Sequence, residues 1–333
     1  MNNQMCRFAE TGILFKKYGV LFCCYAHTTL PIIFPSLDDF DVDEYLMIRK
    51  KNRTEPMPAC ETCPRYVEGN WNKNGKLKVF HIADSDACNF KCEYCVSRGN
   101  TPFKEHYTRV LPILKEFYHR DLIDENAHFS FAAGEPALCK GIDEVLDFVN
   151  EINGVIVIAS NCSVYSKTFE SVLREKRAYL TCSIDAGTRE TFRKVKGGVD
   201  CFDKVIENIS KYVKEAQPKT RVKSKYIIYD SNYQFKEIIE FVKIMYQIGI
   251  KLIVFDFNSM DRHLINEKYL RSMALGRFLC EKLDISVEMG PTRLVIDSGF
   301  SLDDKLNSIS DDCKDIFESI FDGLLARHSN LRK

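Results

Sequence analysis

Six short apolar runs alternate with stretches of helical periodicity between residues 77 and 260. The runs, which we predict to be strands, are 77–83, 128–132, 155–159, 179–184, 221–229 and 252–257. Apolar residues at helical spacing cover 105–119, 141–151, 201–215 and 234–248. Strands separated by helices pair in parallel, because a parallel crossover needs a dozen or more residues. Right-handed crossovers wind such units into a barrel or an open arc, so we expect an α/β fold.

Polar residues fall where these predicted strands end. In a βα barrel, the carboxyl ends of the strands form the rim on which sites are built. The strand ends offer five polar candidates, which are Glu135, Ser160, Asn161, Ser183 and Asp185. We therefore expect the functional site on this rim.

Cys88, Cys92 and Cys95 follow the first predicted strand at the spacing Cys-x3-Cys-x2-Cys. Thiolates at these offsets on one loop can all point toward one metal centre. Four cysteines would close a cubane iron–sulfur cluster, whereas three leave one iron without a protein ligand. Catalytic metal sites keep an open position of this kind. A zinc-binding loop is the alternative that the triplet alone leaves open.

The cysteine loop and the strand ends together resemble the radical S-adenosylmethionine (SAM) superfamily. The resemblance rests on the cysteine triplet with Tyr94 before its last thiol, on Gly134-Glu135, and on Ser183-x-Asp185. In that superfamily the methionine moiety of SAM chelates the open iron, and reductive cleavage releases a 5′-deoxyadenosyl radical. The resemblance implies a partial (β/α)6 barrel, the radical SAM core, over residues 76–260.

The resemblance also assigns roles to residues at the strand ends. The implied SAM-binding residues are Tyr94, Gly134, Glu135, Ser160, Asn161, Ser183, Asp185, Arg193 and Lys225. Glu135 is expected to receive the methionine ammonium, and Asp185 to accept from the ribose hydroxyls. Lys196 belongs to the same basic stretch as Arg193, for which a solvated loop is the alternative. Lys225 is expected either to pair the methionine carboxylate or to extend to solvent.

A second group of cysteines lies before the predicted core. Cys6, Cys24, Cys60 and Cys63 supply four thiolates, enough to close a site without an open position. The pattern resembles the twitch module, half of the SPASM auxiliary-cluster domain, although that module usually follows the core. It implies an auxiliary 4Fe-4S cluster within residues 1–75. Zinc is the alternative, and the sequence does not decide whether Cys23 or Cys24 is the ligand.

Charge and hydropathy narrow the range of partners. Lys+Arg and Asp+Glu number 47 each, and this neutral balance argues against a nucleic-acid partner. No apolar run reaches the length of a membrane span, and no signal peptide begins the chain, so no membrane partner is expected. Fourteen cysteines without a signal indicate metal ligation in a reducing compartment, which predicts a cytoplasmic protein.

The leading function is that of a radical SAM enzyme. The resemblance implies a small-molecule or peptide substrate and an electron donor such as flavodoxin or ferredoxin. Oxidation (dehydrogenation) of a sugar, alcohol or peptidyl substrate is the first expectation. A radical epimerase with Cys139 or Cys162 as hydrogen donor is the alternative, and a non-catalytic zinc or iron–sulfur binding module is the alternative of another class. Residues 261–333 are expected to form a C-terminal α/β extension that closes the barrel.

Overall fold

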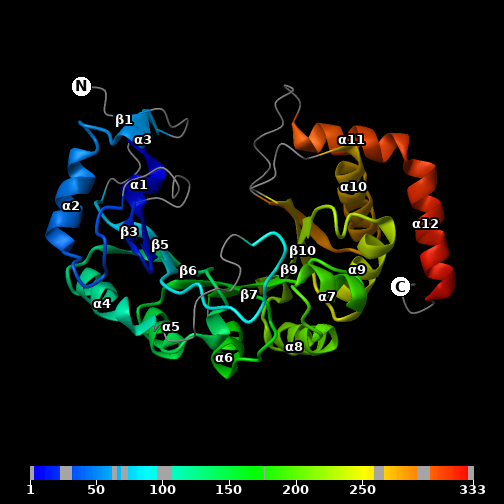
Figure 1. Cartoon of the computed structure of the whole chain (residues 1–333), viewed down its shortest axis with the longest axis horizontal. Helices are drawn as coiled ribbons and strands as arrows, with labels where there is room; N and C mark the ends of the chain where they lie inside the picture. The colour runs from blue at the N-terminus through cyan, green and yellow to red at the C-terminus, as the bar shows by residue number, and fades with distance from the viewer. Residues whose placement is uncertain are drawn as a thin grey trace. The chain divides into compact units, whose positions relative to one another are not determined.

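The structure is a computed structural model that describes residues 4–22, 32–61, 66–68, 74–95, 107–175, 177–258, 266–290 and 301–328. Strands and helices alternate along most of the chain (Figure 1). The chain divides into two compact units. The first comprises residues 1–89, 99–160 and 166–179, and the second comprises residues 90–98, 161–165 and 180–333.

The first unit contains seven strands among the described residues. Its elements are β1 (Gln4–Cys6), α1 (Arg7–Thr11), β2 (Gly12–Lys16), β3 (Gly19–Leu21), α2 (Val42–Lys51), α3 (Pro58–Glu61), β4 (Tyr66–Glu68), β5 (Leu77–Ala83), α4 (Leu111–His119), β6 (Ile123–Phe131), α5 (Ile142–Glu151), β7 (Val155–Ser160) and α6 (Lys167–Glu175). The strands β2, β5, β6 and β7 pair in parallel in that order, and β3 pairs antiparallel with β2. The strands β1 and β4 form a separate antiparallel pair.

The second unit continues the alternation from β8 onward. Its elements are β8 (Ala178–Ser183), α7 (Arg189–Val195), α8 (Phe202–Glu215), β9 (Val222–Ile228), α9 (Phe235–Gln247), β10 (Leu252–Phe257), α10 (Glu267–Lys282), β11 (Ser286–Met289), α11 (Leu302–Asp312) and α12 (Lys314–Arg327). The strands β8, β9, β10 and β11 pair in parallel in that order. No helix in the described part of the chain is long and apolar enough to cross a membrane.

The strand order is β11-β10-β9-β8-β7-β6-β5-β2-β3 in one nine-stranded sheet, whose two edge strands do not pair with each other in the described part of the chain. All six predicted strands are present as β5 to β10 in chain order. The open, mostly parallel sheet with its crossover helices confirms the predicted α/β partial barrel. In its described part, the C-terminal extension adds β11 and three helices.

The first unit has a clear division between a packed and an open face of its sheet. Alternate residues of a strand point to opposite faces. Phe80 of β5 and Phe129 of β6 stack at 4.7 Å on one face, and Phe117 of α4 meets Phe80 edge-on. His81 and Ser130 alternate with these rings and therefore lie on the opposite face. Helix packing thus uses the aromatic face and leaves polar side chains on the other.

The second unit repeats this division. Tyr226 of β9 contacts Phe241 of α9 at a ring separation of 4.7 Å, on the face that packs against helices. The alternate residue Lys225 pairs with Asp256 of β10 at 3.2 Å, so the other face carries charge. The sequence therefore builds polar faces in both units from the same two-residue period.

Residues 12–21 depart from the expected Cys-rich module because they contribute strands to the main sheet. Leu14 of β2 lies opposite His81 of β5 in a parallel pairing, and β3 returns antiparallel. The Tyr45 hydroxyl of α2 donates to the Gly12 carbonyl at 3.0 Å and fixes the start of β2. The division into domains at residues 75 and 260 does not coincide with the two compact units, and it stays a prediction.

Candidate functional site

Gly134 and Glu135 follow β6 and pack directly on the start of the cysteine loop. Gly134 has φ +60°, and a Cβ there would lie 2.3 Å from the Ala87 carbonyl oxygen. The Glu135 amide donates to that same oxygen at 2.7 Å. Only glycine combines this backbone conformation with so close an approach. The loop after β6 therefore holds the backbone immediately before Cys88.

The Glu135 carboxylate is fully buried and its orientation is fixed. Its Oε1 accepts from the Ser160 hydroxyl at 2.7 Å and from the Ala137 amide at 3.2 Å. A buried carboxylate needs such donors, because burial without hydrogen bonds is costly. Ser160, predicted to contact SAM, thus lies on Glu135 and orients it. A carboxylate held in this way is suited to receive an ammonium group.

The second part of the cysteine loop, residues 91–95, is attached to the end of α7 in the second unit. The Glu93 amide donates to the Val195 carbonyl at 3.0 Å, and the Lys91 amide to the Lys196 carbonyl at 3.4 Å. Gly197 has φ +76°, and a Cβ there would lie 2.5 Å from the Lys91 carbonyl oxygen. The backbone that carries Cys92 is therefore positioned by the residues that leave α7.

A buried polar cluster, formed by Tyr94, Asp185 and Lys196, lies beneath this loop. The Lys196 ammonium is 2.6 Å from Asp185 Oδ2, and both side chains are almost completely buried. The Tyr94 hydroxyl donates to the same oxygen, and the Ile227 amide donates to Oδ1 at 2.6 Å. Burial, with the Asp185 charge beside it, raises the pKa of Tyr94 well above its usual value, so the phenol stays protonated.

Asp185 is thus occupied inside the protein, with three donors on its carboxylate. Its predicted contact with the ribose is not tested by this geometry and stays a prediction. Lys196, rather than Arg193, is the basic residue that reaches the cluster, and Arg193 is exposed. The sequence analysis gave both residues as candidates, and nothing in the sequence showed which of the two side chains would reach Asp185.

The three thiols of the triplet are half-buried. Burial raises the pKa of the Cys92 thiol, and the nearby Lys196 charge partly opposes this effect. Within the described ranges, no three His, Cys, Asp or Glu side chains form a group around a single metal ion. A 4Fe-4S cluster makes a different demand, because each thiolate binds its own iron.

Comparison with known proteins identifies the superfamily. The family model described as the radical SAM superfamily matches residues 82–242, which include the cysteine triplet, Glu135 and the buried cluster. This part of the chain belongs to the radical SAM superfamily. The protein is therefore a radical SAM enzyme, with a 4Fe-4S cluster and SAM as its cofactors.

Relatives of this radical SAM chain have more than one activity. A GTP 3′,8-cyclase of Clostridium botulinum (strain Okra / Type B1) is 22% identical over 231 residues, 67% of this chain and 71% of that protein. An S-adenosylmethionine-dependent nucleotide dehydratase of Flammeovirga pacifica is 27% identical over 123 residues, 35% of this chain and 40% of that protein. The crystal structure of Streptococcus suis SuiB bound to precursor peptide SuiA has a TM-score of 0.50 at 15% identity, covering 91% of this chain and 78% of that one. This last likeness concerns the fold.

The residues on the two loops fit the groups that radical SAM enzymes bind. Three thiols leave one iron open, and the fully buried Glu135 carboxylate supplies an anionic acceptor on the adjoining loop. The close approach of Gly134 to Ala87 brings that loop against the one that begins the triplet. The assignment of individual residues to the cluster and to SAM stays a prediction.

The remaining predicted SAM contacts lie on the second unit. The Asn161 Oδ1 accepts from the Ser163 amide at 2.9 Å, which closes a local turn. Ser183 is half-buried at the end of β8. The Lys225 ammonium pairs with Asp256 at 3.2 Å, and 27% of the Lys225 side chain is exposed. None of these contacts is tested by the geometry.

The N-terminal cysteines are only partly described. Cys6 and Cys60 are buried, whereas Cys24 and Cys63 lie outside the described residues, as does Cys23. Pairing of β1 with β4 places Cys6 opposite Tyr66, three residues beyond Cys63 in the chain. The auxiliary site stays a prediction.

Proposed function

We propose that this enzyme abstracts a hydrogen atom from a small-molecule or peptide substrate and that the substrate is then oxidised. The observation that carries the proposal is the attachment of the Glu135 loop to the backbone before Cys88. The cluster, when bound, supplies the electron for SAM cleavage. Flavodoxin or ferredoxin in the cytoplasm is the proposed source of that electron.

The proposal gives a role to the three thiols of the cysteine loop and to Glu135 on the loop after β6. Cys88, Cys92 and Cys95 hold the cluster as thiolates. Glu135, oriented by the Ser160 hydroxyl, receives the methionine ammonium through a charge-assisted hydrogen bond.

The buried polar cluster of Tyr94, Asp185 and Lys196 has a positioning role. Lys196 neutralises Asp185, and Asp185 in turn accepts from the Tyr94 hydroxyl. Tyr94 lies between two of the proposed cluster ligands, so its orientation determines how the thiols are presented. A buried ion pair is weak evidence for stability, but removing one partner is strongly destabilising.

Burial of the candidate hydrogen donors favours oxidation over epimerisation. An epimerase needs a thiol that faces the substrate. The Cys162 side chain is fully buried, and the Cys139 sulfur is buried within 3.4 Å of the Ser85 hydroxyl and the Glu135 carbonyl oxygen. The Cys139 thiol is therefore already directed at oxygens of the protein, which makes it a poor hydrogen donor to a substrate. Oxidation needs an electron acceptor, and the proposed N-terminal cluster is the one we infer.

The names of the relatives add nucleotides to the candidate substrates. A GTP cyclase and a nucleotide dehydratase both act on nucleotides, as their names state. We therefore place nucleotides beside sugars, alcohols and peptidyl residues in the substrate screen. Cyclisation and dehydration conserve the redox state of the substrate, so product analysis separates them from oxidation.

The test is turnover in deuterium oxide with anaerobically reconstituted enzyme, SAM and a reductant. Oxidation predicts a product two electrons more oxidised than the substrate and free of new carbon-bound deuterium. Deuterium at an inverted centre would instead establish an epimerase. A protein that makes no 5′-deoxyadenosine with any candidate would support the non-catalytic module.

A further inference from the structure

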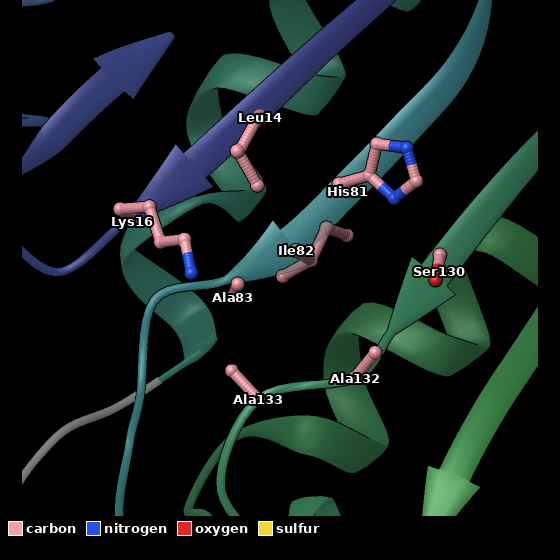
Figure 2. A pocket seen from close by; sticks show the side chains of 8 residues that line it. All are labelled: Leu14, Lys16, His81, Ile82, Ala83, Ser130, Ala132 and Ala133. Carbon is pink, nitrogen blue, oxygen red and sulfur yellow. The ribbon is translucent and has the colours of Figure 1, made fainter. Parts of the chain in front are cut away.

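A pocket of about 170 Å³ opens on the face of the first unit's sheet that carries His81 and Ser130 (Figure 2). It is lined by residues of three neighbouring strands and of the loop after β6. The strands are β2, from the N-terminal segment, and β5 and β6, from the core. The N-terminal segment and the core thus build this pocket together.

Strand register explains why the pocket lies there. Leu14, His81 and Ser130 are aligned across β2, β5 and β6, and in the next row Lys16 lies opposite Ala83. All of these residues share one face, because they occupy alternate positions. Small side chains, including Ala83, Ala132 and Ala133, leave the space that larger residues would fill (Figure 2).

Three polar side chains line the pocket, and none has a hydrogen-bond or ion-pair partner in the described part of the chain. They are Lys16, His81 and Ser130. The next lysine along the hairpin, Lys17, does have one and pairs with Asp86 at 2.8 Å. The pocket is therefore lined by an ammonium, an imidazole and a hydroxyl group. None of the three makes a hydrogen bond to another described residue, so all three can bind a ligand.

The charge of this hollow is positive. Lys16 contributes a cation, and the described residues that line the pocket include no carboxylate. Burial, with the Lys16 charge beside it, lowers the pKa of His81, so the imidazole is neutral near pH 7 and can donate one hydrogen bond. One cation with two neutral donors is a set that suits an oxyanion.

We propose that this pocket binds an oxyanion group of the substrate, a carboxylate or a phosphate. The inference rests on the proposed function, because it names the chemistry of that substrate. The volume is well below the roughly 300–1,000 Å³ of sites that enclose whole ligands, so the pocket takes one substituent. Ala83 directly precedes the loop to Cys88, and Ala133 directly precedes Gly134-Glu135, so the anchored group lies beside both loops.

Lysine footprinting of the reconstituted holoenzyme tests the proposal, with inorganic phosphate and acetate as the probes. Acetylation of Lys16 is followed by mass spectrometry, with exposed Lys115 on α4 as the internal control. We expect saturable protection of Lys16 and none of Lys115. Protection by phosphate indicates a phosphate-bearing substrate, and protection by acetate indicates a carboxylate. Ala132→Leu, which fills the pocket and keeps Lys16, should weaken the protection by about tenfold or more.

Two results would overturn the inference. One is that neither anion changes the reactivity of Lys16, or that Lys16 is protected as strongly in Ala132→Leu as in the wild type. The other is protection of Lys16 by SAM alone with weaker SAM binding in Lys16→Met, which would assign the pocket to the cofactor. SAM cleavage without substrate is measured in parallel. Wild-type enzyme that makes no 5′-deoxyadenosine counts against the proposed function, whereas an unprotected Lys16 in active enzyme counts against the pocket alone.

Discussion

Gly197→Ala should disturb the cysteine loop, whereas Gly198→Ala should not. Both glycines have positive φ, +76° and +93°, so alanine costs about 1–2 kcal/mol at either position. At Gly197 the new Cβ would also lie 2.5 Å from the Lys91 carbonyl oxygen and 2.8 Å from the Lys91 Cβ. At Gly198 nothing lies within 4 Å. The difference between the two variants therefore isolates the contact with the loop.

The backbone of Lys91 cannot yield without moving Cys92, its neighbour in the chain. We expect Gly197→Ala to lose about 1–3 kcal/mol more unfolding free energy than Gly198→Ala, the usual range for an overpacked contact. Anaerobic urea unfolding followed by circular dichroism measures that difference. Iron analysis after reconstitution should show up to about four fewer irons in Gly197→Ala only. Equal stability and equal iron in the two variants would refute the reasoning.

Three further perturbations follow from the same geometry. Glu135→Gln should weaken SAM binding by about 1.5–3 kcal/mol in calorimetry, the range for a hydrogen bond to a charged group, and an unchanged affinity would remove Glu135 from the SAM site. Lys196→Met should cost about 3–5 kcal/mol of unfolding free energy, because it strands the buried Asp185 charge, whereas Lys204→Met in an exposed pair should cost about 0–1 kcal/mol; similar losses in both would contradict this. The pKa of His81 is lowered in the folded protein, so on acidification the unfolded chain binds this proton at a higher pH than the folded chain does. The unfolding free energy therefore falls as the pH drops below about 6.5. Lys16→Met should raise the pKa of His81 in a histidine NMR titration and reduce that acid loss, and an unchanged pKa would place Lys16 too far away to matter.

The core strands were predictable because each carries apolar residues at successive or alternate positions between polar loops. The run over 252–257 matches β10 residue for residue, and the run over 77–83 matches β5. The hairpin of β2 and β3 was missed because the cysteine pattern dominated the interpretation of residues 1–75. Its signal was present, since Ile13-Leu-Phe and Val20-Leu-Phe flank a short polar segment that ends in Gly19.

The partners of buried polar residues could not be predicted in the same way. Asp185 is an acidic residue at a strand end, and the sequence alone does not show that Lys196 neutralises it. Lys196 lies just past the last turn of α7, so the direction of its side chain depends on how the chain leaves the helix. Ser160 is a similar case, because only the packed loops show that its hydroxyl is directed at Glu135.

The measurement that tests the central claim most directly is 5′-deoxyadenosine formation by reconstituted, reduced enzyme with SAM. It compares the wild type with the triple variant in which Cys88, Cys92 and Cys95 are alanine. Cys280→Ala serves as a control, since Cys280 is fully buried in α10, away from the triplet in sequence. Our account predicts 5′-deoxyadenosine from the wild type and the control, and none from the triple variant. Continued 5′-deoxyadenosine formation by the triple variant would contradict it.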